Sequence, residues 1–162
     1  MNVTEIYGAL NDKNDPDYKR RNKHADLYYE TRRNSKKEPW IKKVAANIGM
    51  NEKAISKIFD HVFIKEHEIY GELKRFYSSY DMAESFRRLQ EGKNIQPHDL
   101  ILIKHERLEA ELMNRYGYNQ SKAHTLASRK YNYAAALTAW HKEQDLNRKS
   151  RTSGDQRGKS HL

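Results

Sequence analysis

The sequence predicts a mainly α-helical fold, with five to six helices around one small core. Helix-breaking residues are rare, with only 7 glycines and 3 prolines in 162 residues. Apolar residues recur at helical spacing through long charged stretches. Hydrophobic residues make up 36% and charged residues 33% of the chain, so the core must be thin.

We expect three regions along the chain. Residues 1–22 are rich in Asn and Asp and form a loose leader. Residues 23–146 form a single helical domain. Residues 147–162 have no apolar side chain before Leu162 and form a disordered basic tail, which either only solvates the chain or serves as a nucleic-acid arm.

Capping and breaking residues delimit the expected helices. They run from about Lys23 to Arg33, from Pro39 to near Gly49, from the Asn51 cap to about Ile64, from a cap at Ser78 or Ser79 to Gly92, from Pro97 to before Gly117, and from the Asn119 cap to near Asp145. A short β-hairpin is expected only near 65–77, where Gly71 would form its turn.

Several functional classes are excluded by what the sequence lacks. The chain has no cysteine, which rules out disulfides, thiolate metal sites and a cysteine nucleophile. It has no apolar run of 18 residues and no basic and apolar start typical of a signal peptide, so we expect no membrane partner. It also lacks a Gly-rich phosphate loop, a GxSxG elbow and EF-hand spacing.

The charge of the chain favours a polyanionic partner, nucleic acid above an acidic protein or an anionic membrane surface, although a basic surface could also serve only to keep a small domain in solution. Lys and Arg number 31 against 22 Asp and Glu, which gives a formal net charge of +9. Tyr28, Tyr29 and Trp40 interleave with a basic stretch over 19–43, where they could stack on bases or belong to the core. The expected nucleic-acid-binding residues are Arg32, Arg33, Lys36, Lys37, Lys42, Lys43, Arg75 and Arg88.

The segment IKKVAANIGMNEKAISKIFD (41–60) matches a helix-turn-helix pattern. Ala45 suits a close approach of two helices, and Gly49 suits a turn that needs positive φ. The pattern is compatible with a purely structural helix pair and with an element that docks on DNA.

The segment 97–116 carries the sharpest chemical pattern. His98, His105 and Glu109 fall on one stripe of the expected helix. His105 and Glu109 lie one turn apart and could share a metal ion or a proton, and Glu106 lies beside them in an HExxE spacing. The second histidine of an HExxH zinc helix is missing, so a divalent metal, a metal-free acid–base pair and a structural histidine all remain open.

His61 lies in an apolar helical stretch, between Phe59 and Phe63. It could be a satisfied core histidine, or it could join a second histidine from another helix as base and acid in a metal-free RNase arrangement. Arginines 75, 87 and 88 could then stabilise the charge of a phosphate in the transition state. The candidate catalytic residues are therefore His105, Glu109, His61, His98 and Glu106.

Five segments together resemble a module found at the C-terminus of polymorphic toxins of Gram-positive bacteria, including LXG-type secreted toxins, and in phage-encoded proteins. They are HADLYYE (24–30), VAANIGMNEKAISKIFDHVF (44–63), RFYSSYDMAESFRRLQEGKNIQPHD (75–99), LIKHERLEAELM (102–113) and AHTLASRKYNY (123–133). The resemblance covers about two thirds of the chain. No delivery domain accompanies the module here, so an excised toxin module, a phage remnant and a stand-alone protein all remain open.

The resemblance implies a poison that acts in the cytoplasm, commonly a nuclease, and that a small immunity protein neutralises. It also implies delivery by a secretion system without a cleaved signal peptide. The first residues to consider are His61, His98, Asp99, Lys104, His105, Glu106 and Glu109. We therefore expect a toxin-like nuclease using His–carboxylate or metal-assisted chemistry; the alternative is a non-catalytic helix-turn-helix DNA-binding protein or a phage-encoded adaptor.

Overall fold

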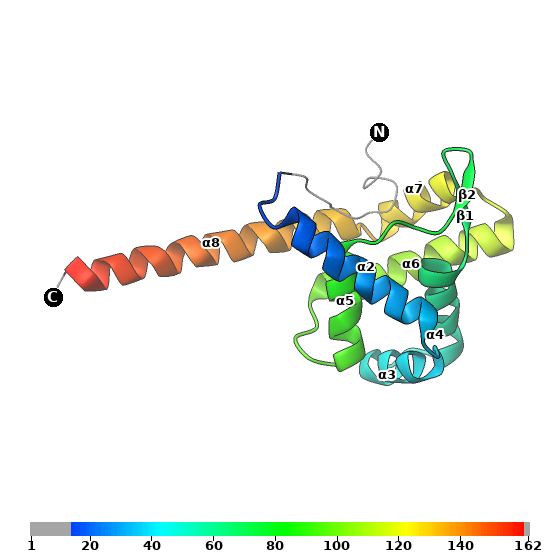
Figure 1. Ribbon diagram of the computed structural model, residues 1–162, viewed down its shortest axis with the longest axis horizontal. Coiled ribbons are helices and arrows are strands. Elements are labelled where there is room, and N and C mark those ends of the chain that lie inside the picture. The colour runs from blue at the N-terminus through cyan, green and yellow to red at the C-terminus, as the bar shows by residue number, and fades with distance from the viewer. Residues whose placement is uncertain (1–13, 161–162) are drawn as a thin grey trace.

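A computed structural model describes residues 14–160, with side chains described as far as Arg151. This part of the chain is mainly helical and contains one short antiparallel hairpin, as the sequence predicted, with seven α-helices where five to six were expected (Figure 1). The elements are α2 (Tyr18–Asn34), α3 (Glu38–Ile48), α4 (Glu52–Phe59), the π-helical turn η1 (Asp60–Ile64), β1 (His67–Ile69), β2 (Glu72–Lys74), α5 (Tyr80–Glu91), α6 (Pro97–Tyr116), α7 (Gln120–Lys130) and α8 (Tyr133–Ser160).

Most helix ends fall where the sequence placed them because local chemistry sets them. The side chains of Asn51, Ser79 and Asn119 each accept a hydrogen bond from a backbone N–H in the first turn of α4, α5 and α7. Gly49 ends α3 at a φ of 67°, a left-handed conformation that few other residues adopt cheaply. The hairpin also forms as expected, with His67 opposite Lys74 and its turn at Tyr70 and Gly71.

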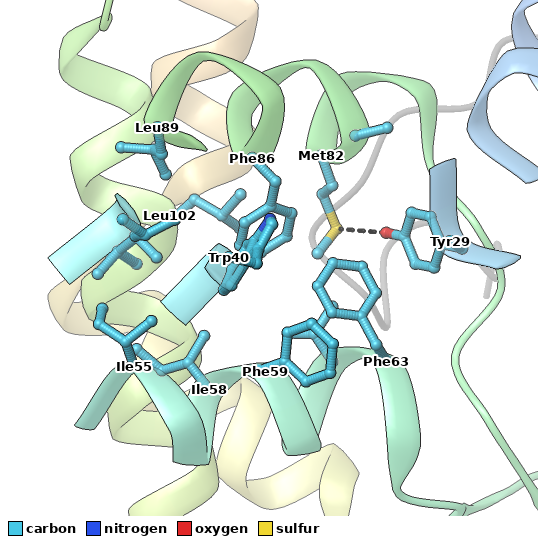
Figure 2. Close-up of a cluster of buried hydrophobic side chains, with 14 of the residues drawn as sticks. Tyr29, Trp40, Ile55, Ile58, Phe59, Phe63, Met82, Phe86, Leu89 and Leu102 are labelled. Carbon is cyan, nitrogen blue, oxygen red and sulfur yellow. Dashed lines mark hydrogen bonds between the residues drawn. The ribbon is translucent and has the colours of Figure 1, made fainter. Parts of the chain in front are cut away.

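Aromatic and branched side chains from α2 to α6 fill the core (Figure 2). Trp40 of α3 lies edge-on to Phe59 and Phe63, with ring centroids 5.2 and 5.8 Å away. Tyr29 of α2 packs on Phe63 and donates a long hydrogen bond to the sulfur of Met82. Tyr29 and Trp40 are buried, so they are not available to stack on bases.

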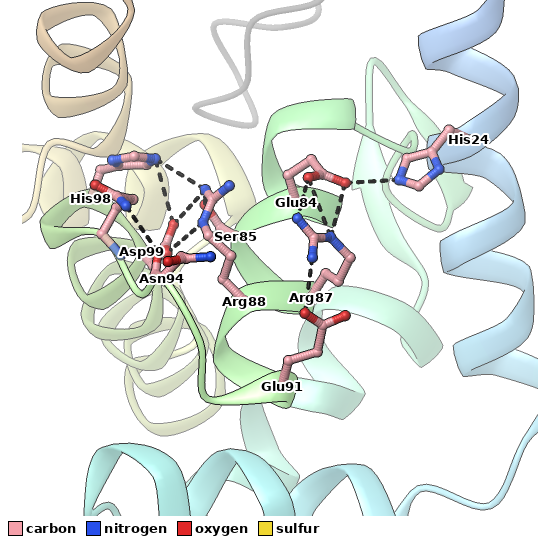
Figure 3. Close-up of polar contacts among 10 residues, drawn as sticks. His24, Glu84, Ser85, Arg87, Arg88, Glu91, Asn94, His98 and Asp99 are labelled. Atoms are coloured by element: carbon pink, nitrogen blue, oxygen red, sulfur yellow. Dashed lines mark hydrogen bonds and ion pairs between the residues drawn. The ribbon is translucent and has the colours of Figure 1, made fainter. Parts of the chain in front are cut away.

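Ionic contacts tie α5 to the helices on either side of it (Figure 3). On one side, Glu84 lies 2.9 Å from the imidazole of His24 in α2. On the other, Arg88 donates two hydrogen bonds to Asp99, at 2.8 and 2.9 Å, and Asp99 also accepts the backbone N–H of Gln96 to cap α6. Asp99 is fully buried, so this bidentate contact is what makes its charge tolerable there.

The expected sixth helix is wrong as a single element, because it breaks at Tyr131 and Asn132 into α7 and α8. The N–H of Ala135 would bond the Tyr131 carbonyl in a continuous helix. It bonds the side chain of Asn132 instead, at 2.9 Å, so Asn132 caps the new helix α8. The carbonyl of Tyr131 is thereby left for another donor.

The two expected irregular ends also differ from the structure where it describes them. Residues 18–22, assigned to the loose leader, belong to α2, and residues 1–13 lie outside the described part. Residues 147–160, expected as a disordered tail, continue α8, which projects far beyond the helical body (Figure 1). Its Lys, Arg and Gln residues favour helix once a helix has started. Among the described helices, none combines the length and the apolar character needed to cross a membrane.

A matched pair of leucines on α6 tests the position of the core. Leu102 is 1% exposed and Leu100 is 39% exposed. We expect Leu102→Ala to lower the free energy of unfolding by about 2–5 kcal/mol, because it removes buried methyl groups and leaves a cavity. Leu100→Ala should lower it by less than ~1 kcal/mol. Urea unfolding followed by circular dichroism measures both, and equal effects would contradict the assigned face of α6.

Candidate functional site

Five ionisable side chains from three separate elements meet inside the helical body. They are His61 of η1, His105, Glu106 and Glu109 of α6, and His124 of α7, and we call them the His–Glu cluster. His61, His105, Glu106 and Glu109 are each no more than 3% exposed, and the side chain of His124 is 12% exposed. Such a concentration of buried ionisable groups is typical of functional sites and needs a physical account.

Glu109 is the centre of this cluster. Its Oε1 lies 3.0 Å from Nε2 of His61 and accepts a hydrogen bond from the Gln120 amide at 3.4 Å. Its Oε2 lies 3.0 Å from Nε2 of His105 and 3.2 Å from Nδ1 of His124. Together the two carboxylate oxygens therefore contact nitrogen atoms from three elements, η1, α6 and α7.

The local backbone explains how the histidines reach Glu109. The π-helical turn places His61 in a widened loop of backbone, closed by a hydrogen bond from the Lys65 N–H to the Asp60 carbonyl. The ring of His67 in β1 bonds the His61 carbonyl at 2.9 Å and stacks on Phe76, which fixes the hairpin against this turn.

The break between α7 and α8 orients His105. Its Nδ1 lies 3.0 Å from the carbonyl of Tyr131, the group released where α8 begins at its Asn132 cap. A carbonyl only accepts, so Nδ1 must carry a proton and donate. This contact leaves Nε2 of His105 directed at Glu109, either as a second N–H donor or as a free lone pair.

Glu106 is the least satisfied member of the cluster. Its Oε2 accepts no hydrogen bond from any described residue, and Nε2 of His61 is 3.6 Å away. Glu106 and Glu109 also line a small cavity of about 10 Å³, room for about one water molecule, together with Tyr29, Phe76, Tyr77 and Met82. Phe76 and Tyr77 lie between β2 and α5, so this segment forms one wall of the cavity.

The pKa values of the two carboxyl groups shift in opposite directions. Burial, reinforced by the neighbouring charge of Glu109, raises the pKa of Glu106 to about 7. Burial acts in the same direction on Glu109, but hydrogen bonds from His105, His124 and His61 outweigh it and hold the pKa of Glu109 well below its ordinary value. For His105, burial is likewise outweighed by the bond to Glu109 and by both carboxylates, which raise its pKa to about 9.

The ligand types in the cluster suit a metal ion. Two groups of three donor atoms share Glu109: one comprises His105, Glu109 and His124, and the other His61, Glu106 and Glu109. The atoms of each group lie within 4.8 Å of one another. Three imidazoles and two carboxylates resemble the donor sets of zinc and other transition metals more than the all-oxygen sets of Mg²⁺ or Ca²⁺.

Four of the five expected catalytic residues are brought together: His61, His105, Glu106 and Glu109. His98 is not, because it lies at the other end of α6, where its Nε2 is 3.2 Å from Arg88 and its ring packs on Trp140. Burial lowers the pKa of His98, and the neighbouring Arg88 acts in the same direction. His98 therefore belongs to the contact network of Asp99, not to the His–Glu cluster.

The expected nucleic-acid-binding residues divide into two groups. Four make internal contacts: Arg33 donates to the carbonyls of Phe63 and Phe76, Lys37 pairs with Asp60 at 3.1 Å, and Arg88 pairs with Asp99. The fourth, Arg32, lies over the ring of Tyr28. Lysines 36, 42 and 43 and Arg75 are exposed, and Arg75 also donates to the Ile64 carbonyl.

The sequence interpretation missed His124 and Gln120. Both lie on α7, which packs against α6, and neither shares a motif with His105. The one signal was that His124 follows the Asn119 cap on the same expected helix face as Gln120. That signal does not say which way the face points, so the sequence alone could not connect α7 with Glu109.

Comparison of the chain with protein families, with curated proteins and with solved structures found no match.

The hydrogen bonds of His105 predict an unusual titration in protein kept free of metal by EDTA. We expect the imidazole of His105 to titrate with a midpoint near pH 9 and that of His98 to titrate below 6.5. A raised pKa means that folding stabilises the charged ring, so this contribution to stability is complete below about pH 6.5 and is lost as pH rises through about 9. NMR of the ring resonances, assigned with His→Gln variants, measures both midpoints; a His105 midpoint at or below 6.5 would refute the assignment.

Proposed function

We propose that the protein is a toxin-like nuclease that hydrolyses phosphodiester bonds of RNA or DNA at the His–Glu cluster. The observation that carries the proposal is that two buried carboxyl groups, one helical turn apart, differ in their partners and in their pKa. Glu109 is held charged by three imidazoles, whereas Glu106 has a free oxygen and a pKa raised to about 7. A base with such a pKa is poised to accept and return a proton near neutral pH.

The proposed reaction assigns a different role to each group. A water oxygen bonds to phosphorus while Glu106 accepts one of the water's protons. The ester P–O bond breaks, and the departing oxygen takes a proton from the cluster, for which His105 or His124 is the donor. Glu109 touches no substrate in this scheme; it is a positioning residue that aligns the imidazoles and stabilises their positive charge.

Substrate access would require a movement of the chain segment that covers the cavity. Phe76 and Tyr77 line the cavity and lie in the stretch between β2 and α5, which has no regular secondary structure. A short covering segment of this kind can move while the helices stay in place. In the proposal, displacement of Tyr77 admits a phosphate to Glu106, and its return excludes water.

A groove on the neighbouring face of α6 offers a binding surface for the rest of the nucleic acid. Lys53 and Lys57 of α4 line it from one side, and Arg107 and Arg115 of α6 line it from the other. Glu111 is the one acidic side chain in its lining and lies 3.4 Å from Arg115. Four cations against one anion in a concave surface favour contact with a phosphate backbone.

The resemblance to toxin modules supplies the biological setting of the proposal. In that setting the protein degrades nucleic acid in the cytoplasm of a target cell, and a cognate immunity protein protects the producer. Induced expression in bacteria should then arrest growth, and Glu106→Gln should relieve the arrest at equal expression level.

A cleavage assay with purified protein tests the enzymatic proposal. Total RNA and plasmid DNA are incubated with the wild-type chain, with and without EDTA. We expect Glu106→Gln and His105→Ala to lower the cleavage rate by about 10²–10⁴-fold, the usual effect of removing a general acid or base. Both variants should keep the helical circular dichroism spectrum.

His141→Gln is the matched control for this assay. His141 also lies 3.1 Å from a carboxylate, Asp81, but far from the cluster on α8. The His141→Gln variant should cleave at the wild-type rate. Full activity in both cluster variants, or no cleavage by the wild-type chain, would refute the proposal.

The second candidate function is non-catalytic DNA binding through α3 and α4. The observation in its favour is that exposed residues at the start of α4, Asn51 and Lys53, line the same basic groove. The start of the second helix is where a helix-turn-helix protein contacts base edges. Tight binding of duplex DNA without cleavage would support this candidate over the nuclease.

The groove between α4 and α6 predicts which basic side chains contact nucleic acid, whether the protein is a nuclease or a DNA-binding protein. Lys53→Ala and Arg107→Ala should each weaken binding, and each should reduce the slope of log affinity against log salt by ~0.9 if it contacts one phosphate of duplex DNA. Lys93→Ala, an exposed lysine between α5 and α6 and outside the groove, is the control. Fluorescence anisotropy over a salt series measures the slopes; an equal loss in all three variants would mean that only net charge matters.

A further inference from the structure

We propose that the His–Glu cluster is a binding site for a divalent transition-metal ion of the Zn²⁺ type, with His61, His105, His124, Glu106 and Glu109 as the ligands. The inference deepens the proposed function and rests on it for the role of the ion in hydrolysis. With an ion bound, the ion would activate the water and stabilise the departing oxygen, and the proton transfers assigned above to Glu106, His105 and His124 would belong to the metal-free protein. Binding of the ion itself depends only on the geometry of the five side chains.

Within each of the two donor groups, the distances between neighbouring ligand atoms are close to those around a small cation. Zinc bonds to nitrogen and oxygen are about 2.0–2.1 Å long, so two ligands in a tetrahedral site lie about 3.3 Å apart. In the cluster, Oε2 of Glu109 lies 3.0 Å from Nε2 of His105 and 3.2 Å from Nδ1 of His124. Nε2 of His61 lies 3.0 Å from the other Glu109 oxygen and 3.6 Å from Oε2 of Glu106.

The hydrogen bond of His105 to the Tyr131 carbonyl is the kind of contact that orients a metal ligand. A histidine that binds a metal commonly donates its other N–H to a carbonyl or carboxylate, which fixes the ring and its tautomer. Here Nδ1 donates to Tyr131, at 3.0 Å, and Nε2 points at Glu109. In neutral His105 the lone pair of Nε2 would face a carboxylate oxygen, and a cation between the two atoms turns this repulsion into two bonds.

The free oxygen of Glu106 is a second, independent indication. A buried carboxylate oxygen without a hydrogen bond is rare in folded proteins, because burial without a partner is costly. Oε2 of Glu106 belongs to a side chain that is 3% exposed, and it has no such partner among the described residues. It forms one group of donor atoms with His61 and Glu109, so an ion bound there would satisfy it.

The ligand set selects the class of metal. Three of the five ligands are imidazoles, which bind Zn²⁺, Co²⁺, Fe²⁺ and Ni²⁺ well, whereas Mg²⁺ prefers oxygen ligands and retains its water. Glu109 is shared by both donor groups, so the cluster could hold one ion or a carboxylate-bridged pair. An ion here would lower the pKa of a bound water that faces the cavity beside Glu106.

Metal binding by the full chain, measured without any substrate, tests the inference. The purified protein is stripped with EDTA, dialysed and titrated with Zn²⁺ by calorimetry. We expect submicromolar binding of one or two ions per chain and a rise in melting temperature of at least about 4 °C. Co²⁺ should give the visible absorption bands of a low-symmetry site with nitrogen ligands, and Mg²⁺ at the same concentration should not bind.

Two variants and one control assign the ions to the cluster. Glu109→Gln removes the ligand shared by both groups, and His124→Gln removes the most exposed imidazole, so at least the second should fold. Each should lower Zn²⁺ affinity by ~100-fold or more, since even outer contacts of metal ligands are worth ~10–100-fold. His141→Gln should bind as the wild-type chain does. Absent Zn²⁺ and Co²⁺ binding, or equal affinity in wild type and His124→Gln, overturns the inference.

The outcomes also separate the metal site from the nuclease. Tight Zn²⁺ binding that His124→Gln weakens, with no cleavage of RNA or DNA under any metal, supports the metal site and removes the proposed function. Undiminished cleavage by stripped protein in EDTA, together with no Zn²⁺ binding, overturns the metal site and leaves the nuclease as a metal-free enzyme.

Discussion

The buried charge of Glu109 is the constraint on which the arrangement of this protein depends. An ionised carboxylate removed from water destabilises a fold unless several donors surround it. Glu109 is 2% exposed and contacts nitrogen atoms of His61, His105, His124 and Gln120. These donors come from η1, α6 and α7, so satisfying one carboxylate fixes three elements relative to one another.

Two departures from regular helix lie next to this carboxylate, and both supply it with a partner. The π-helical turn at 60–64 carries His61, and the break at 131–132 frees the carbonyl that orients His105. Each departure loses a regular i→i−4 hydrogen bond and gains another. In the π-helical turn the Lys65 N–H donates to the Asp60 carbonyl, and at the break the Ala135 N–H donates to the Asn132 side chain. Backbone irregularities of this kind tend to occur where a side chain must reach a particular point.

The charges of the chain serve separate purposes in different places. Arg88 and Asp99 form a buried bidentate pair that closes the first turn of α6 and holds α5 against it (Figure 3). The lysines and arginines of the groove between α4 and α6 lie at the surface, where they cost little and can meet a polyanion. The net charge of +9 is therefore not spread evenly over the surface: Arg33, Lys37 and Arg88, all expected to bind nucleic acid, make internal contacts.

The sequence alone determined the helical class, most helix ends and the hairpin, because caps, glycines and helical periodicity act over a few residues. It also determined that His105, Glu106 and Glu109 lie within one turn of each other, since helix geometry fixes that spacing. Only the tertiary structure decided that His61 and His124 join them and that His98 does not. Which helix face meets which depends on packing between segments that are distant in sequence, and the 48 residues separating His61 from Glu109 carry no local signal of that contact.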